Sequence, residues 1–410
     1  MKNKKIVPII VSVIAMLSVV CISSFTREKP PKKQNDINNI AALSSKATAD
    51  TPESDEEMRG VWVSYMELSM ENESSKTQKA FEDKFTEIAE KSRESGFNTL
   101  IVQIRPFCDA LYKSSYFPWS HILTGTQGKN PQYDALQIMC DICKENNLKI
   151  HAWINPYRVS SNETPKKLSD NNPYIKNSEI GIKTDNGIFL DPSNETAQQL
   201  ISDGVKEIAE NYDVDWIQFD DYFYPTKNES FDKKQYEAYI EKYGKENSMS
   251  LDNWRMQNVN TLICKVYRTI KSVDSSVEFG ISPQGNIGNN DGLYADVKSW
   301  CTCKGFVDYI CPQIYFSLEN PALTFEDCLD SWTSLDFDEN VKLYVGLGGY
   351  KAGNGEYDEE TWLLSDSILA NEYDILCNNK SVRGFMLYSY NCLEDDTAKK
   401  EINNLINALN

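Results

Sequence analysis

Two adjacent aspartates stand where an apolar strand is expected to end. Asp220 and Asp221 follow residues 216–219, which read Trp-Ile-Gln-Phe. Burying two carboxylates is costly unless they are paired or needed for chemistry. Consecutive strand residues face opposite ways, so alternation turns Asp220 inward and gives Asp221 a supporting role, toward Arg158 or a neighbouring loop. We predict that this pair carries the catalysis; the alternative is that both carboxylates only make hydrogen bonds at a strand end.

Polar and aromatic side chains gather at the ends of the other expected strands. Flat rings beside amides and hydroxyls suit a sugar, which has an apolar face and a rim of hydroxyl groups. The sequence therefore predicts a carbohydrate site. The candidate substrate-binding residues are Arg105, Asp109, Asn155, Tyr157, Arg158, Gln313, Tyr315, Trp62, Trp119 and Trp153.

Cleavage of a sugar chain by carboxylates usually needs a second carboxyl group as acid, base or nucleophile. The sequence does not single one out. Asp109 and Glu319 follow expected strands, and Glu67 and Glu356 lie on longer loops. Asp220 is thus the expected acid/base, and its partner stays open.

Short apolar runs alternate with stretches of helical spacing from Arg59 onward. Eight strands in strict alternation with eight helices predict a parallel sheet with helical crossovers. The strands are apolar throughout, as strands covered on both faces should be. The expected strands are 60–65, 99–105, 149–154, 216–220, 277–281, 307–313, 342–347 and 383–388. The expected helices lie around 77–95, 134–147, 194–211, 251–274, 295–304, 323–334, 360–378 and 395–409.

This alternation predicts an α/β fold of the (β/α)8 TIM-barrel type with enlarged βα loops. In such a barrel the active site gathers at the carboxyl ends of the strands, where the polar residues stand. The rival is a doubly wound open sheet. That fold favours a glycine-rich phosphate turn after an early strand, and the sequence contains no G-x-G-x-x-G or Walker pattern.

Composition narrows the functions further. The chain has 410 residues, 42 basic and 61 acidic, which gives a net charge of −19 and argues against nucleic-acid binding. The two histidines, His121 and His151, are too few for a zinc site of several imidazoles. The C-x-x-C pair at 140 and 143 lacks a second thiol pair at metal-site spacing. We expect no metal and no cofactor.

The N-terminal residues have the pattern of a targeting segment. Three lysines precede an apolar run from Ile6 to Ile22, so residues 1–26 are expected to be a signal peptide or membrane anchor, with lipidation at Cys21 as a third possibility. Residues 27–57 are charged and poor in aromatics, as a disordered linker would be. Residues 58–410 form the expected barrel domain, secreted or held at the outer face of the cell membrane.

Several blocks of the sequence resemble a known bacterial family. The blocks read MRGVWV (58–63), QIRPFCDALY (103–112), FPWSHILTG (117–125), HAWINPYR (151–158), FLDP (189–192), QFDDYFYP (218–225), GISP (280–283) and PQIYF (312–316). Together they resemble the glycosyl-hydrolase-like family 10, a group of exported (β/α)8 proteins. The resemblance implies a hydrolase of glycosidic bonds acting on a cell-wall or other extracellular polysaccharide.

Two other functions stay open at this point. The same barrel could bind a carbohydrate without cleaving it. A polysaccharide deacetylase would need a metal held by aspartate and histidine, and the two histidines stand far apart in the sequence. The expected partners are thus a polysaccharide or oligosaccharide, the membrane through the N-terminal segment alone, and no nucleic acid.

Overall fold

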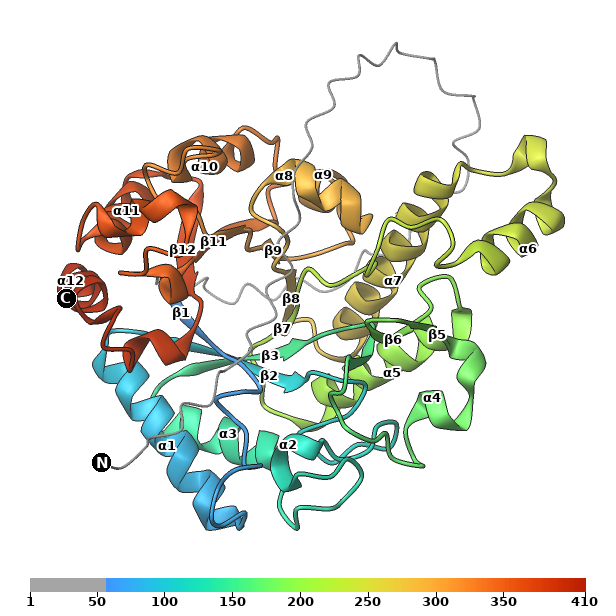
Figure 1. The fold of residues 1–410 in the computed structure, drawn as a ribbon, viewed down its shortest axis with the longest axis horizontal. Helices are drawn as coiled ribbons and strands as arrows, with labels where there is room; N and C mark the ends of the chain where they lie inside the picture. Colours follow the sequence, from blue (N-terminus) through green and yellow to red (C-terminus); the bar gives the residue numbers. More distant parts are fainter. Residues whose placement is uncertain (1–56) are drawn as a thin grey trace, which may run out of the picture. The chain divides into compact units, whose positions relative to one another are not determined.

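The barrel is built from residues 57–410, which are the residues that the computed structural model describes (Figure 1). The expected signal or anchor at 1–26 lies outside the described residues, as does the linker at 27–57 apart from Glu57. Among residues 57–410, no helix is long and apolar enough to cross a bilayer.

Parallel strands close into a ring, which confirms the (β/α)8 barrel. Around the ring the order is β11, β12, β1, β2, β3, β7, β8 and β9, and a pairing between β9 and β11 closes it. β10 continues the β9 position after a short break and also pairs with β11. The strands are β1 Met58–Val63, β2 Thr99–Arg105, β3 Lys149–Ile154, β7 Trp216–Phe219, β8 Glu278–Ile281, β9 Tyr309–Ile310, β10 Gln313–Ile314, β11 Lys342–Leu347 and β12 Val382–Leu387.

A helix follows each strand position and covers the outside of the ring (Figure 1). Side-chain caps mark several helix starts, since a short polar side chain can accept from the free N–H groups of the first turn. Asn194 accepts from the amides of Thr196 and Ala197 at the start of α5, for example. The helices are α1 Gln78–Glu94, α3 Ala135–Glu145, α5 Glu195–Asn211, α7 Leu251–Val273, α9 Val297–Thr302, α10 Phe325–Thr333, α11 Ile368–Asn378 and α12 Lys399–Leu409.

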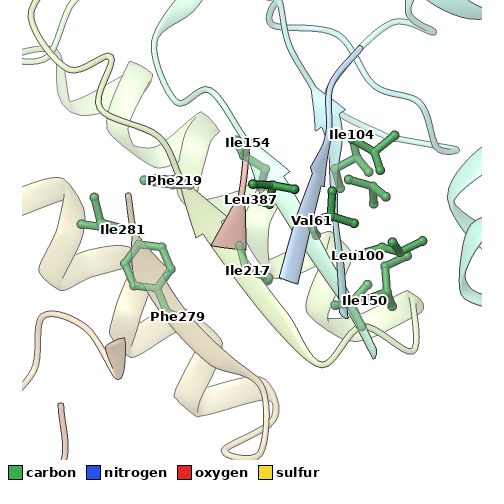
Figure 2. Packing of buried hydrophobic residues seen from close by; sticks show 14 of the residues in the cluster. Val61, Leu100, Ile104, Ile150, Ile154, Ile217, Phe219, Phe279, Ile281 and Leu387 are labelled. Carbon is green, nitrogen blue, oxygen red and sulfur yellow. The ribbon is translucent and has the colours of Figure 1, made fainter. Parts of the chain in front are cut away.

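Apolar side chains of the strands pack in two separate layers. Alternate residues such as Val61, Leu100 and Ile217 face the helices and form the larger core (Figure 2). The residues between them along each strand point into the barrel, where a smaller cluster is made mostly by strand residues. That cluster contains Met58, Trp62, Ile101, Trp153, Trp216, Tyr309, Cys311, Tyr344 and Met386.

Gly280 on β8 makes room for the ring of Tyr309 inside the barrel. A Cβ placed on Gly280 would lie 2.2 Å from the Tyr309 ring, whose hydroxyl donates to Gln218 at 3.1 Å. We expect Gly280→Ala to lower the free energy of unfolding by about 1–3 kcal/mol, because the packed interior cannot move the ring away. Urea unfolding would measure this. Gly288→Ala is the control: its nearest neighbour would lie at 3.4 Å, so a similar loss there would contradict the steric explanation.

Two of the βα loops are enlarged, as predicted. The loop after β3 carries a small antiparallel sheet of β4 (Arg158–Ser161), β5 (Gly181–Thr184) and β6 (Gly187–Leu190). The loop after β7 carries α6 (Lys233–Tyr243), which has no buried residue and stands out from the barrel (Figure 1). Both loops begin at the carboxyl ends of their strands, where barrel enzymes place their chemistry.

Candidate active site

Asp220 lies at the carboxyl end of β7, in the position that strand alternation predicts. Its side chain shares the inner face with Gln218, and the residue is 3% exposed. The Trp153 indole N–H and the Asn155 amide each donate to Asp220 Oδ2, both at 3.1 Å. The backbone N–H of Tyr222 donates to Oδ1 at 3.3 Å. These donors hold the carboxyl group in one orientation above the barrel interior.

Asp221 also reaches the barrel mouth, although strict alternation would turn it outward. β7 ends at Phe219, so the backbone is free to turn before Asp221. Gln284 donates to Asp221 Oδ2, and Gln313 Nε2 donates to Oδ1 at 3.3 Å. Arg158, the partner considered from the sequence, makes no hydrogen bond to Asp221 within residues 57–410. The two aspartates therefore diverge, Asp220 toward the tip of β3 and Asp221 toward the tips of β8 and β10.

Burial and mutual repulsion alter the protonation of this pair. Burial, together with the charge of Asp221, raises the pKa of Asp220 to about 7, although the nearby Arg158 guanidinium opposes the shift. Burial also raises the pKa of Asp221, against the hydrogen bonds from Gln284 and Gln313. A carboxyl group that titrates near neutral pH can both give and take a proton, which suits general acid–base catalysis.

An aromatic cluster surrounds Tyr388, which follows the end of β12. Its ring lies 6.0 Å from Trp62 and 6.5 Å from Trp153, centroid to centroid. Tyr315 stacks on it at 5.8 Å, and Tyr350 meets it edge-on at 5.9 Å. The structure thus brings Trp62, Trp153 and Tyr315 together near Asp220. Trp62 and Trp153 are buried, at 2% and 7% exposed, so Tyr315 and Tyr388 are the half-buried rings of this cluster that a sugar could reach.

Arg105 does not join this group, because a β-bulge turns its side chain from the inner face of the barrel to the face covered by helices. Gln103 is paired with Trp153, but Arg105 is paired with Ile154, so the register shifts between them. Two consecutive residues of β2 then face the helices, as a bulge allows. The Arg105 guanidinium packs on Phe117 at 4.6 Å and is 1% exposed. Arg105 is therefore not part of the proposed site.

Asp109, Tyr157 and Trp119 also lie away from Asp220. Asp109 Oδ2 accepts from Gln127 at 3.0 Å and lies 3.5 Å from His121 Nδ1, within the loop after β2. Tyr157 is 1% exposed and belongs to the helix-facing core, and Trp119 packs against that same core. These positions indicate structural roles for all three side chains.

The contacts of the loop glutamates limit which residue could be the second carboxylate. Glu67 Oε1 accepts from the Ser389 hydroxyl at 2.9 Å, and Oε2 accepts from the Ser64 backbone N–H at 3.0 Å. These bonds place Glu67 beside Tyr388, on the rim of the mouth. Glu319 and Glu356 are exposed, and no contact ties their carboxylates to either aspartate within residues 57–410. Of the candidates from the sequence, Glu67 therefore lies at the rim of the mouth, and the carboxylate next to Asp220 along the chain is that of Asp221.

Neither histidine makes a hydrogen bond or ion pair with Asp220 or Asp221 within residues 57–410. His151 lies inside the barrel, where its Nδ1 is 3.3 Å from the Tyr309 hydroxyl, and His121 lies in α2 (His121–Thr124). Within residues 57–410, no group of three or more His, Cys, Asp or Glu side chains is arranged to hold a metal ion.

Three residues beside the aspartates were not among the expected binding residues. Gln284 holds Asp221, Tyr388 centres the aromatic cluster, and the Tyr222 ring is 57% exposed at the mouth. All three follow strand ends, and this position in the sequence could have marked them as candidates for the site. Their contacts depend on how neighbouring strands are staggered, and the sequence does not give that.

Proteins with similar sequences identify the family of this chain. The family described as Glycosyl hydrolase-like 10 matches residues 57–364. The chain belongs to this family. The glycosyl hydrolase DigH of Escherichia coli (strain K12) is 31% identical, over 98% of each chain. The glycosyl hydrolase YngK of Bacillus subtilis (strain 168) is 36% identical over 74% of this chain, and the match spans 62% of its own length.

Solved structures with little sequence similarity share the barrel fold of this family member. The PgaB (BpsB) glycoside hydrolase domain from Bordetella bronchiseptica superposes with a TM-score of 0.56 at 10% identity, over 85% of this chain and 99% of that one. Alpha-L-fucosidase isoenzyme 2 from Paenibacillus thiaminolyticus gives 0.51 at 14% identity, over 86% of this chain and 49% of that one. At such identities the likeness concerns the fold alone.

Proposed function

We propose that this protein hydrolyses glycosidic bonds of a polysaccharide, with Asp220 as the general acid and base. Asp220 donates its proton to the oxygen of the bond that breaks, and later takes a proton from the attacking water. Asp221 stabilises the positive charge that develops on the sugar ring. Tyr315 packs against the sugar, and the buried rings of Trp62 and Trp153 support the site from inside the barrel.

The observation that carries this proposal is the environment of Asp220. Its carboxyl group is buried, has a pKa of about 7, and is held by donors from Trp153 and Asn155 beside a second carboxylate. Membership of a glycosyl-hydrolase-like family supports the same chemistry.

The proposed location is the outside of the cytoplasmic membrane, with a cell-wall or other extracellular polysaccharide as substrate. The support is the N-terminal sequence, in which lysines precede an apolar run, as in export signals and anchors. Detection of the protein in membrane, periplasmic or culture fractions, but not in the cytosol, would test the location.

Hydrolysis is expected to slow as the pH rises through about 7. An acid must be protonated to donate, and Asp220 loses its proton across that range. The pH dependence of kcat/KM should therefore show an alkaline limb near pH 7. A rate that stays constant up to about pH 9 would contradict the role of Asp220 as the acid.

The proposed activity is tested by incubating the purified protein with peptidoglycan and with a panel of common polysaccharides. Mass spectrometry of the soluble fraction should show new reducing ends on at least one of them. Binding without any product, in wild type as in Asp220→Asn, would instead identify a carbohydrate-binding protein without turnover.

A further inference from the structure

Arg158 has unused hydrogen-bonding capacity at the barrel mouth. Its Nε donates to the Pro106 carbonyl at 2.9 Å, and its backbone N–H donates to Asn155 Oδ1 at 2.9 Å. Within residues 57–410, neither terminal guanidinium nitrogen has a hydrogen-bond or ion-pair partner. The side chain is half-buried, so these nitrogens are not sealed inside the protein.

The Arg158 guanidinium is nevertheless held in place. Its central carbon lies 4.6 Å from the Phe107 ring centroid and 5.5 Å from the Tyr222 ring centroid. Arginine stacks on aromatic faces in this way, and the stacking limits the freedom of its planar group. A ligand that binds it would therefore lose little of its binding free energy to ordering the side chain.

A second arginine in the same fold shows what a structural guanidinium looks like here. Arg255 also lies against two aromatic rings, those of Tyr224 and Tyr294, but its nitrogens donate to Asp232, to the Tyr294 hydroxyl and to backbone carbonyls. Its side chain is 0% exposed. The protein itself accepts hydrogen bonds from all the guanidinium nitrogens of Arg255, whereas the two terminal nitrogens of Arg158 remain available to a ligand.

Asn155 fixes Arg158 next to the proposed acid. Its Oδ1 accepts from the Arg158 backbone, and its Nδ2 donates to Asp220. The charge of Arg158 is felt by Asp220 and Asp221, yet its guanidinium bonds to neither. A group bound by Arg158 would therefore lie beside the bond that Asp220 protonates.

We infer that Arg158 binds a carboxylate of the substrate, so that the protein selects glycans with acidic sugars. The guanidinium edge matches the two oxygens of a carboxylate. The chain as a whole carries a net charge of −19 and repels polyanions, so a local cation is needed to hold an acidic sugar at the mouth. This inference rests on the proposed function, because it names the substrate class of the same site.

The test compares acidic oligosaccharides with their neutral methylamide forms. The probes are oligogalacturonate, hyaluronate oligosaccharides and peptide-free glycan strands of bacterial cell wall, and affinities are measured by titration calorimetry on the full chain. We expect the acid form of at least one probe to bind tenfold or more tightly than its amide, and Arg158→Gln to remove that difference. Arg158→Lys should keep part of it, since the charge remains but the planar fork is lost.

Arg383→Gln is the matched control, because it removes the same charge from an exposed residue at the amino end of β12, opposite the mouth. It should keep the preference for acid forms. Equal or tighter binding of the amide in every pair would overturn the inference, as would a preference that survives Arg158→Gln. Hydrolysis of neutral glycans alone would overturn it and leave the proposed function intact. Binding that prefers the acid forms, without any hydrolysis, would support this inference and contradict the proposed function.

Discussion

Replacing Asp220 by asparagine is expected to reduce kcat by about 10²–10⁴-fold, because asparagine can neither give nor take the proton. Glycan binding should remain, since the substituted side chain can still accept from Trp153 and Asn155 through its amide oxygen. The alkaline limb near pH 7 should disappear from whatever activity is left. Initial rates, together with binding measured by calorimetry, would separate the chemical step from affinity.

The same replacement is expected to stabilise the protein at alkaline pH. The pKa of Asp220 is about 7 when folded and close to 4 when unfolded, so the folded state holds this proton more strongly. Stability contributed by the neutral group is complete below about pH 4 and is lost as the pH rises from about 4 to about 7. At about pH 8, Asp220→Asn should unfold with a free energy higher by about 1–4 kcal/mol.

Asp191→Asn is the control for the loss of activity. Asp191 is buried, and its Oδ1 accepts from the Ser193 backbone and hydroxyl, which an amide oxygen can also do. It lies in the loop between β6 and α5 rather than beside Asp221. If Asp191→Asn lost as much activity as Asp220→Asn, the assignment of the acid would be wrong.

Replacing Arg255 by methionine is expected to lower the free energy of unfolding by about 3–5 kcal/mol. Arg255 and Asp232 form an ion pair in which both side chains are 0% exposed, and methionine would leave the Asp232 carboxylate buried without a partner. Arg255 also donates to the carbonyls of Lys227 and Asn228, so it ties the segment after Asp221 to α7. Urea unfolding would measure the loss.

A double variant distinguishes an unpaired charge from lost packing. Arg255→Met with Asp232→Leu removes both charges, and it should recover most of the stability because no buried carboxylate is left alone. The surface pair of Lys79 and Asp83, with side chains 75% and 63% exposed, provides the control, and Lys79→Met should leave the unfolding midpoint unchanged. A loss below about 1 kcal/mol for Arg255→Met would mean that water reaches Asp232.

The barrel itself was predictable because each strand and helix is encoded locally. The runs at 99–105, 149–154 and 342–347 were expected as strands with the bounds that the structure shows. Continuous apolar strands separated by amphipathic helices leave few ways to bury both faces of a parallel sheet. The inward position of Asp220 followed from the two-residue period of β7.

The composition of the site depended on features that short-range patterns do not contain. The bulge in β2 moved Arg105 from the mouth to the helix layer, and the end of β7 at Phe219 let Asp221 turn inward. The contacts of Tyr388, Gln284 and Arg158 join segments that are distant in the sequence and meet only through staggered neighbouring strands.

The sequence alone therefore determined the eight strand positions, the main helix after each, the barrel and the strand end that carries the two aspartates, because hydrophobic period and turn residues are local properties. It did not give the break between β9 and β10, the start of α11 at Ile368 or the presence of α6. Only the tertiary structure decided which polar side chains meet at that end. These contacts depend on the register of neighbouring strands, on a one-residue bulge and on the residue at which each strand ends. A shift of one residue in any of these moves a side chain to the opposite face of the sheet.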